Sequence, residues 1–252
     1  AHRAGGGQQL VGGEVRHAGT VDAARRYARR TVPLVDDLRA ACADEWRAFT
    51  HHPFVAGMAD ATLPEAAFRT YLIQDYRFLV HFARAHALEA FKADTVEDLR
   101  WAASAAAGII ETEMRLHVDY CAGWGIGEAE LEAAEELPEN TAYTSFVIET
   151  GLDGDALDLA VALMPCTVGY GEIGARLVAD PATVRGADNP YEPWIATFGG
   201  DAFQDGVADA TARLDRLAER HGAADRAEAL RAIFAEAARL EAAFWQMGLD
   251  RV

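Results

Sequence analysis

From Val35 onward, apolar residues recur at the spacing of a helix face and nowhere at the spacing of a strand. The pattern i, i+3, i+4, i+7 runs through almost every segment, and no stretch of β-branched residues alternates with polar ones. Alanine is abundant and only eight residues are proline, which favours helices over sheets. The sequence therefore predicts an all-α protein.

Breaks in this pattern locate the helix ends to within a few residues. Thr62 and Thr95 each begin a sequence typical of a capping box at a helix start. Pro165 interrupts a long apolar segment, so we expect either a kink or a fresh helix start beside Cys166. The predicted helices span residues 35–51, 64–92, 96–123, 127–135, 139–151, 155–178, 190–198, 201–221 and 224–247.

Residues 1–33 differ from the rest of the chain in composition. They combine a glycine-rich opening with several arginines, in a protein that is otherwise acidic. The segment lacks the apolar core of a signal peptide, and Glu14 and Asp22 argue against a transit peptide. We predict an N-terminal extension over residues 1–33 and a single all-α domain over residues 34–252, because a chain of this length lies near the upper size of one hydrophobic core.

The charge of the chain argues against two classes of partner. The 23 Lys and Arg residues against 40 Asp and Glu residues give a net charge of −17, which repels phosphate backbones and anionic lipid surfaces. The longest uncharged stretch, residues 159–171, is shorter than the roughly 17 to 25 residues of a membrane-spanning helix. Cys42, Cys121 and Cys166 form neither a disulfide framework nor a zinc motif. We expect a cytoplasmic protein that binds neither nucleic acid nor membrane.

Three side chains are candidates for chemistry. If Pro165 starts a new helix, the thiol of Cys166 lies near its N-terminus, where the helix dipole lowers a thiol pKa and raises the thiolate fraction. Asp75 lies in an apolar, aromatic segment, and Glu241 shares a helix face with Phe244. Buried carboxylates of this kind need partners or a raised pKa. Taken one at a time, each of the three is explained at least as well by core packing.

Glu111, Glu113 and His117 also admit a metal-site interpretation. Glu113 and His117 are four residues apart, so both could bind one ion from a single helix face. A two-iron site would need further Glu and His pairs on other helices, and the predicted helix 224–247 contains no His. A hydrogen bond between Glu113 and His117 is the more common arrangement, and we predict no metal.

A series of ordered motifs between Trp46 and Trp245 resembles a known family. The motifs are His52-Pro-Phe-Val55, Asp60-Ala-Thr-Leu-Pro64, Tyr71-Leu-Ile-Gln-Asp-Tyr76, Glu111-Thr-Glu-Met-Arg-Leu-His117, Tyr143-Thr-Ser145, Leu163-Met-Pro-Cys166 followed by Tyr170-Gly-Glu-Ile-Gly174, Pro190-Tyr-Glu-Pro-Trp-Ile195 and Glu241-Ala-Ala-Phe-Trp245. With them the sequence resembles the thiaminase II family, also called the TenA-like proteins. The resemblance implies a haem-oxygenase-like all-α bundle, usually a homotetramer, that needs no haem, metal or other cofactor.

The resemblance also implies roles for individual residues. Cys166 matches the nucleophile of the family, Glu241 its general acid/base, and Asp75 the carboxylate that holds an aminopyrimidine ring. The implied substrate-binding residues are Tyr143, Tyr170, Phe244, Phe78 and Phe198. Phe78 and Phe198 stand where family members often have Tyr, so a polar contact is lost at each position.

The activity implied by the resemblance is hydrolysis of 4-amino-5-aminomethyl-2-methylpyrimidine, and of thiamin, to 4-amino-5-hydroxymethyl-2-methylpyrimidine in thiamin salvage. The Cys166 thiolate would add to the electron-poor ring and expel the substituent on the exocyclic CH2 group. Glu241 would protonate the leaving group and then deprotonate water. Two alternatives stay open: a relative that only binds the hydroxymethylpyrimidine or its phosphate, and an oxygenase or oxidase of the same bundle.

Overall fold

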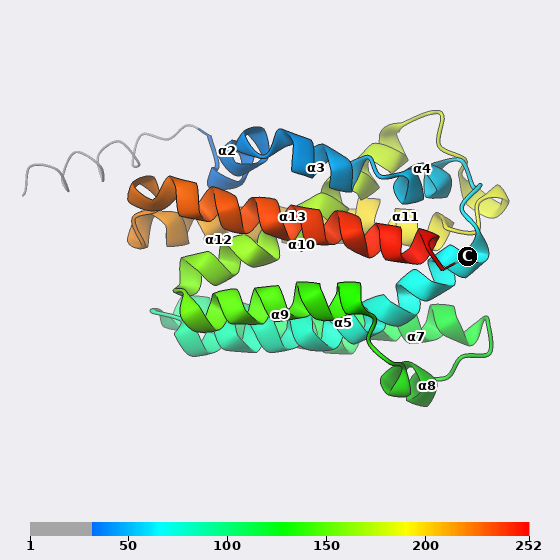
Figure 1. The fold of residues 1–252 in the computed structure, drawn as a ribbon, viewed down its shortest axis with the longest axis horizontal. Coiled ribbons are helices and arrows are strands. Elements are labelled where there is room, and N and C mark those ends of the chain that lie inside the picture. Colours follow the sequence, from blue (N-terminus) through cyan, green and yellow to red (C-terminus); the bar gives the residue numbers. More distant parts are fainter. Residues whose placement is uncertain (1–31, 252) are drawn as a thin grey trace, which may run out of the picture.

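In the computed structural model, which describes residues 32–251, every regular element is a helix. Figure 1 shows the helices packed lengthwise into one elongated bundle. In chain order they are α2 (Leu34–Ala41), α3 (Ala43–Thr50), α4 (Pro53–Ala59), α5 (Glu65–Lys92), α6 (Val96–Gly108), the π-helical turn η1 (Ile109–Glu113), α7 (Met114–Ala122), α8 (Glu128–Ala133), α9 (Pro138–Asp153), α10 (Ala156–Ala179), the 3-10 turn η2 (Gly186–Asp188), α11 (Glu192–Gly199), α12 (Asp201–Arg220), the 3-10 turn η3 (Ala223–Arg226) and α13 (Ala227–Leu249). The predicted all-α class is confirmed. The predicted extension over residues 1–33 lies outside the described residues, except for its last two.

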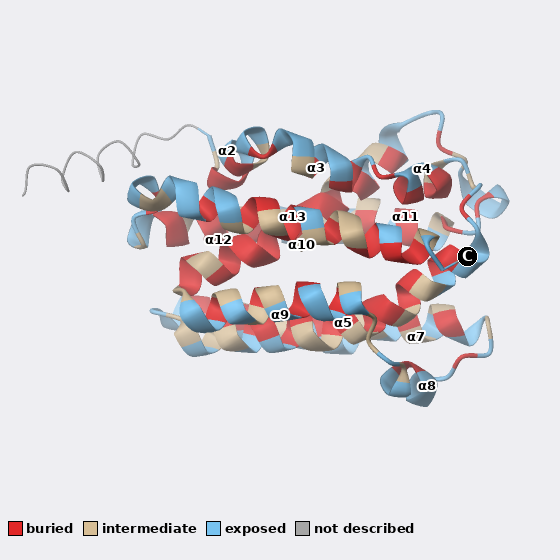
Figure 2. Cartoon of the chain, viewed as in Figure 1, coloured by how far each residue is buried: buried red, intermediate tan, exposed pale blue. Residues whose placement is uncertain are grey.

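Helix α10 is the core of the bundle. It packs against α3, α5, α9, α11, α12 and α13, and Figure 2 shows buried residues along the faces where the long helices meet. By length and composition α10 is the one helix among the described residues that could cross a membrane, yet 78% of its most apolar window is buried inside the bundle. That burial is typical of a core helix, which is apolar on all sides because other helices surround it.

Asp155 and Pro165 have opposite effects on helix α10. Its start is fixed by Asp155, whose side chain accepts hydrogen bonds from the backbone N–H groups of Leu157 and Asp158. Pro165 lies inside the helix, which continues to Ala179, so no fresh start occurs beside Cys166. An interior proline costs about 3 kcal/mol, and packing of α10 on six other helices outweighs that cost.

Several details inside the predicted helix ranges differ from the structure. The expected helix 35–51 is two helices that meet at Cys42, and α4 was not predicted. The Thr62 hydroxyl donates to Asp60 (2.6 Å) instead of capping α5, which begins after Pro64. The expected helix 96–123 is interrupted by η1. The second capping residue, Thr95, does accept from a backbone N–H group of its helix, as predicted.

A glycine on α10 brings α11 close to the core. A Cβ atom at Gly174 would lie 2.3 Å from the carbonyl carbon of Phe198, so the two helices touch backbone to backbone. The Gln204 side chain holds this contact, because its Nε2 donates to the carbonyls of Phe198 (2.9 Å) and Gly171 (3.0 Å). The glycine thereby sets the position of the Phe198 ring.

Candidate active site

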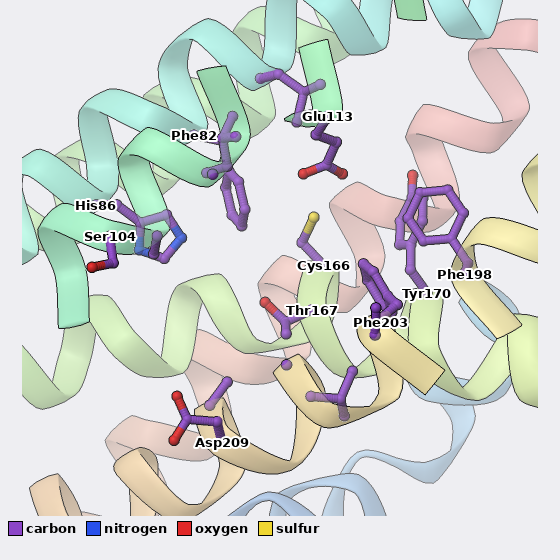
Figure 3. A pocket seen from close by; sticks show the side chains of 18 of the residues that line it. Phe82, His86, Ser104, Glu113, Cys166, Thr167, Tyr170, Phe198, Phe203 and Asp209 are labelled. Carbon is purple, nitrogen blue, oxygen red and sulfur yellow. The ribbon is translucent and has the colours of Figure 1, made fainter. Parts of the chain in front are cut away.

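A cavity of about 410 Å³ opens between two groups of helices. Helices α5 and α6 with η1 line one side, and α10, α11 and α12 line the other (Figure 3). Small-molecule sites typically have volumes of roughly 300 to 1,000 Å³. The described lining is mostly apolar and aromatic and contains no Lys or Arg. The cavity therefore suits a flat molecule that is neutral or cationic better than a phosphorylated one.

Asp75 reaches the cavity from the buried face of α5. Its Oδ2 atom accepts a hydrogen bond from the Tyr71 hydroxyl (3.1 Å) and lies 2.6 Å from Nε2 of His117. Both contacts fall on the same oxygen. Within residues 32–251 the second oxygen, Oδ1, has no hydrogen-bond partner, so it is available to a ligand.

His117 holds Asp75 in an ion pair. Its Nδ1 atom lies 2.9 Å from the Glu113 carbonyl oxygen, which can only accept, so Nδ1 carries a proton. Nε2 faces the carboxylate of Asp75 and carries a second proton. Burial alone would lower the pKa of His117, but the hydrogen bond and the negative charge of Asp75 raise it overall. The imidazolium thereby offsets the charge of Asp75.

Cys166 lies in the middle of α10, and its sulfur points into the cavity (Figure 3). Burial raises the pKa of this thiol well above its ordinary value, and the nearby carboxylates of Glu241, Glu113 and Asp75 raise it further. The predicted lowering by a helix N-terminus is wrong, because no helix starts there. At neutral pH the sulfur keeps its proton and needs a base to become a nucleophile.

Glu241 is positioned to be that base. Its carboxyl group lies close enough to the Cys166 thiol for each group to shift the pKa of the other, and the Tyr143 hydroxyl donates to its Oε1 atom (2.8 Å). Burial raises the pKa of Glu241 to about 8, although the Tyr143 bond acts in the opposite direction. A carboxyl with a pKa near neutrality can take a proton and return it in the working pH range.

The structure brings the candidate residues from the sequence together in two layers. Four of them line the cavity: Asp75, Cys166, Tyr170 and Phe198. The other four are buried just outside its lining: Phe78, Tyr143, Glu241 and Phe244. The Phe78 ring packs on Tyr143 (4.9 Å between centroids) and Phe244 (5.7 Å). The two positions where Phe replaces Tyr therefore differ: Phe198 lines the cavity, whereas Phe78 packs against residues beside it.

Glu113 belongs to the site, although the sequence presents it as half of a candidate metal pair. It ends the π-helical turn η1, lines the cavity, and points its carboxyl toward Cys166 (Figure 3). Burial raises the pKa of this carboxyl to about 7. Single π-helical turns often occur at functional sites. Their position depends on tertiary packing, and the regular helical pattern of residues 96–123 contains no signal for one.

Glu113 and His117 are not arranged as metal ligands. Both ring nitrogens of His117 are engaged, one by Asp75 and the other by the Glu113 carbonyl. The predicted Glu113–His117 hydrogen bond thus exists, but the backbone makes it and the carboxyl does not. Nowhere in the described part of the chain do three His, Cys, Asp or Glu side chains form a group that could hold a metal ion.

The far end of the cavity is supported by a buried charge network. Trp101 forms part of the wall, and the Arg213 guanidinium lies 4.3 Å from its ring centroid. Arg213 donates to Glu89 (2.7 Å), which also pairs with His86 (2.7 Å). The sequence does not identify this network, because isolated charges on an amphipathic helix are usually exposed to solvent.

Sequence comparison identifies relatives of this chain. The sequence model of the TENA/THI-4/PQQC family matches residues 39–251. Aminopyrimidine aminohydrolase from Bacillus subtilis is 35% identical over 214 residues, which cover 84% of this chain and 88% of the relative. The protein of the same name from Halalkalibacterium halodurans is 34% identical over 206 residues, with 81% and 90% covered.

Solved structures give the same result. A protein described as a TenA family transcription regulator, from Silicibacter, superimposes with a TM-score of 0.79 at 44% identity, covering 86% of this chain and 96% of that chain. A domain with a heme oxygenase-like fold from Shewanella denitrificans gives a TM-score of 0.63 at 13% identity, covering 88% and 94%. The second match shows the shared fold alone. The predicted resemblance is confirmed: the helices form a haem-oxygenase-like bundle, and the chain belongs to the TENA/THI-4/PQQC family.

Proposed function

We propose that this protein is an aminopyrimidine aminohydrolase that acts in thiamin salvage. It converts 4-amino-5-aminomethyl-2-methylpyrimidine into 4-amino-5-hydroxymethyl-2-methylpyrimidine, and thiamin is a second substrate. One observation carries the proposal: the Cys166 thiol and the half-engaged carboxylate of Asp75 line one cavity, and the buried carboxyl of Glu241 lies beside the thiol. Relatives named aminopyrimidine aminohydrolase, 32% to 35% identical, support the same activity.

Asp75 orients the pyrimidine ring. Its free Oδ1 atom accepts hydrogen bonds from the amino edge of the ring, while His117 and Tyr71 hold Oδ2. Such charge-assisted bonds are short and directional, so they fix which ring carbon faces the sulfur. Tyr170 and Phe198 line the same part of the cavity and pack against the faces of the ring.

Cys166 acts as the nucleophile and Glu241 as its base. The thiol passes its proton to Glu241, and the thiolate adds to the ring carbon next to the one that bears the substituent. The C–N bond then breaks and its electrons leave with the substituent, which takes up a proton when it is an amine. Water adds to the exocyclic carbon and gives up a proton in turn. Finally the C–S bond breaks, and the sulfur regains its proton from Glu241. Tyr143 keeps the Glu241 carboxyl directed toward the thiol throughout.

Replacing Cys166 by Ala tests the proposal. The wild-type protein should hydrolyse the aminomethyl compound, followed by chromatography of the product, and Cys166→Ala should abolish turnover. Affinity for the hydroxymethyl product should stay within about tenfold, because the thiol acts mainly in the transition state. Full activity of Cys166→Ala would contradict the cysteine mechanism, and an inactive wild-type protein that binds the product would identify it as a binding-only relative.

Two further expectations complete the proposal. We propose that the chain assembles as a homotetramer, as the family resemblance implies, and that it acts in the cytoplasm, as its cysteine content suggests. Analytical ultracentrifugation would measure the assembly, and a monomer at micromolar concentration would contradict it.

A further inference from the structure

Glu113 stands apart from the other acidic groups of the cavity. Three acidic residues line it: Asp75, Glu113 and Asp209. Asp75 is paired with His117, and Asp209 accepts a hydrogen bond from the Trp101 indole (2.5 Å). Across residues 32–251 no group hydrogen-bonds the carboxyl of Glu113, although this side chain points into the cavity. An unpaired carboxyl directed at a ligand cavity is available for proton transfer.

The π-helical turn and His117 hold Glu113 in this position. The turn η1 ends at Glu113, whose neighbour Glu111 is exposed to solvent. The imidazole of His117 donates to the Glu113 carbonyl and at the same time pairs with Asp75. One side chain therefore fixes the distance between the backbone of Glu113 and the carboxylate that we assign to ring binding.

Glu113 and Glu241 differ in their access to the cavity. Glu241 is 2% exposed, accepts a hydrogen bond from Tyr143, lies near the Cys166 thiol, and is not part of the cavity lining. Glu113 lines the cavity and faces Cys166 from across it (Figure 3). Of these two carboxyls, therefore, only Glu113 can be reached by a substituent that projects into the cavity.

We propose that Glu113 is the general acid that protonates the leaving nitrogen, while Glu241 serves the thiol. This inference rests on the proposed hydrolase activity and divides a task that the family resemblance gives to Glu241 alone. As the C–N bond breaks, its electron pair goes to nitrogen, and the Glu113 carboxyl supplies the proton that makes the amine leave as ammonia. The resulting Glu113 carboxylate then takes a proton from the water that adds to the exocyclic carbon, which restores the acid form.

The ionisation of Glu113 suits this role. Burial raises the pKa of its carboxyl to about 7, so a large share of the protein carries the acid form at neutral pH. The pKa of Glu241 is raised further, to about 8. A single carboxyl could not hold the thiol proton and donate a second proton to the amine in the same step, whereas two carboxyls can.

Substrates with different leaving groups test the proposal in the full-length protein. The aminomethyl compound needs a proton on its leaving amine. Thiamin does not, because its thiazolium nitrogen leaves as a neutral thiazole, and the same holds for an analogue in which pyridinium replaces thiazolium. Since kcat/KM reports steps only up to departure of the leaving group, Glu113→Gln should lower kcat/KM for the aminomethyl compound about 100-fold or more and change it less than about threefold for the two quaternary compounds.

Glu111→Gln is the matched control. It makes the same chemical change on the same turn, at an exposed position, and should leave all three rates unchanged. Circular dichroism should show the same helix content for both variants. An equal fall for all substrates, or none for any, would overturn the assignment of Glu113. A wild-type protein that hydrolyses none of the compounds would overturn the proposed function instead.

Discussion

Replacing Glu241 by Gln should stabilise the protein while it removes activity. In the unfolded chain this carboxyl has an ordinary pKa of 4.5, and in the folded protein burial raises the pKa to about 8. At pH 7 ionisation of this carboxyl therefore lowers the free energy of the unfolded state, whereas in the folded state the carboxyl stays mostly protonated. At 1.36 kcal/mol per pKa unit, this difference lowers the free energy of unfolding by about 3 kcal/mol at pH 7.

The sign of the pH dependence follows from proton counting. Below pH 4.5 both states hold the proton and Glu241 makes no difference to stability. Between pH 4.5 and 8 the folded state binds more protons, so the wild type loses stability as pH rises, and the loss levels off above pH 8. In Glu241→Gln the amide does not ionise, so this pH-dependent loss of stability is absent. Its amide still accepts from Tyr143, but it leaves about one hydrogen bond poorly satisfied, which costs about 1 kcal/mol.

Urea unfolding followed by circular dichroism at pH 5, 7 and 8 measures the effect. The difference in free energy of unfolding, variant minus wild type, should be near zero at pH 5, about 2 kcal/mol at pH 7 and larger at pH 8. Glu236→Gln is the control, because it changes the same atoms on α13 at a side chain that is only half-buried and pairs with Arg239 near the surface. It should shift stability by less than about 0.5 kcal/mol at each pH. A difference that does not change with pH would refute a raised pKa for Glu241.

Two further predictions concern α11. Gly174→Ala should lower the free energy of unfolding by about 1 to 3 kcal/mol, because the added methyl group meets the backbone of Phe198. The control Gly206→Ala should not destabilise the protein, because nothing lies within 4 Å of a Cβ atom there. Urea unfolding of both variants measures the difference, and equal stabilities would contradict the close contact. Phe198→Tyr should raise kcat/KM for the aminomethyl compound about two- to tenfold, since its hydroxyl would add a hydrogen bond worth about 0.5 to 1.5 kcal/mol beside the ring. A fall on both the aminomethyl compound and thiamin would instead indicate a pocket shaped for another ligand.

The sequence by itself determined the all-α class and most helix positions. The ends of α5, α9, α10 and α12 agree with the predicted ranges to within a few residues, because helical periodicity and capping residues such as Asp155 act over a few neighbouring positions. The ordered motifs also identified the family and named Asp75, Cys166 and Glu241 as candidates. These properties depend on local sequence, so one chain contains enough information to predict them.

Tertiary structure alone decided the electrostatics of the site. The sequence predicts a lowered pKa for Cys166 from the neighbouring Pro165, yet the bundle keeps α10 continuous and surrounds the thiol with carboxyl groups from three other elements, which raises it. The pairing of Asp75 with His117 joins residues 42 positions apart. A pKa depends on burial and on charges that come together only when helices pack. For the same reason Glu113 becomes a candidate acid only in the folded protein, where a π-helical turn directs it toward the sulfur.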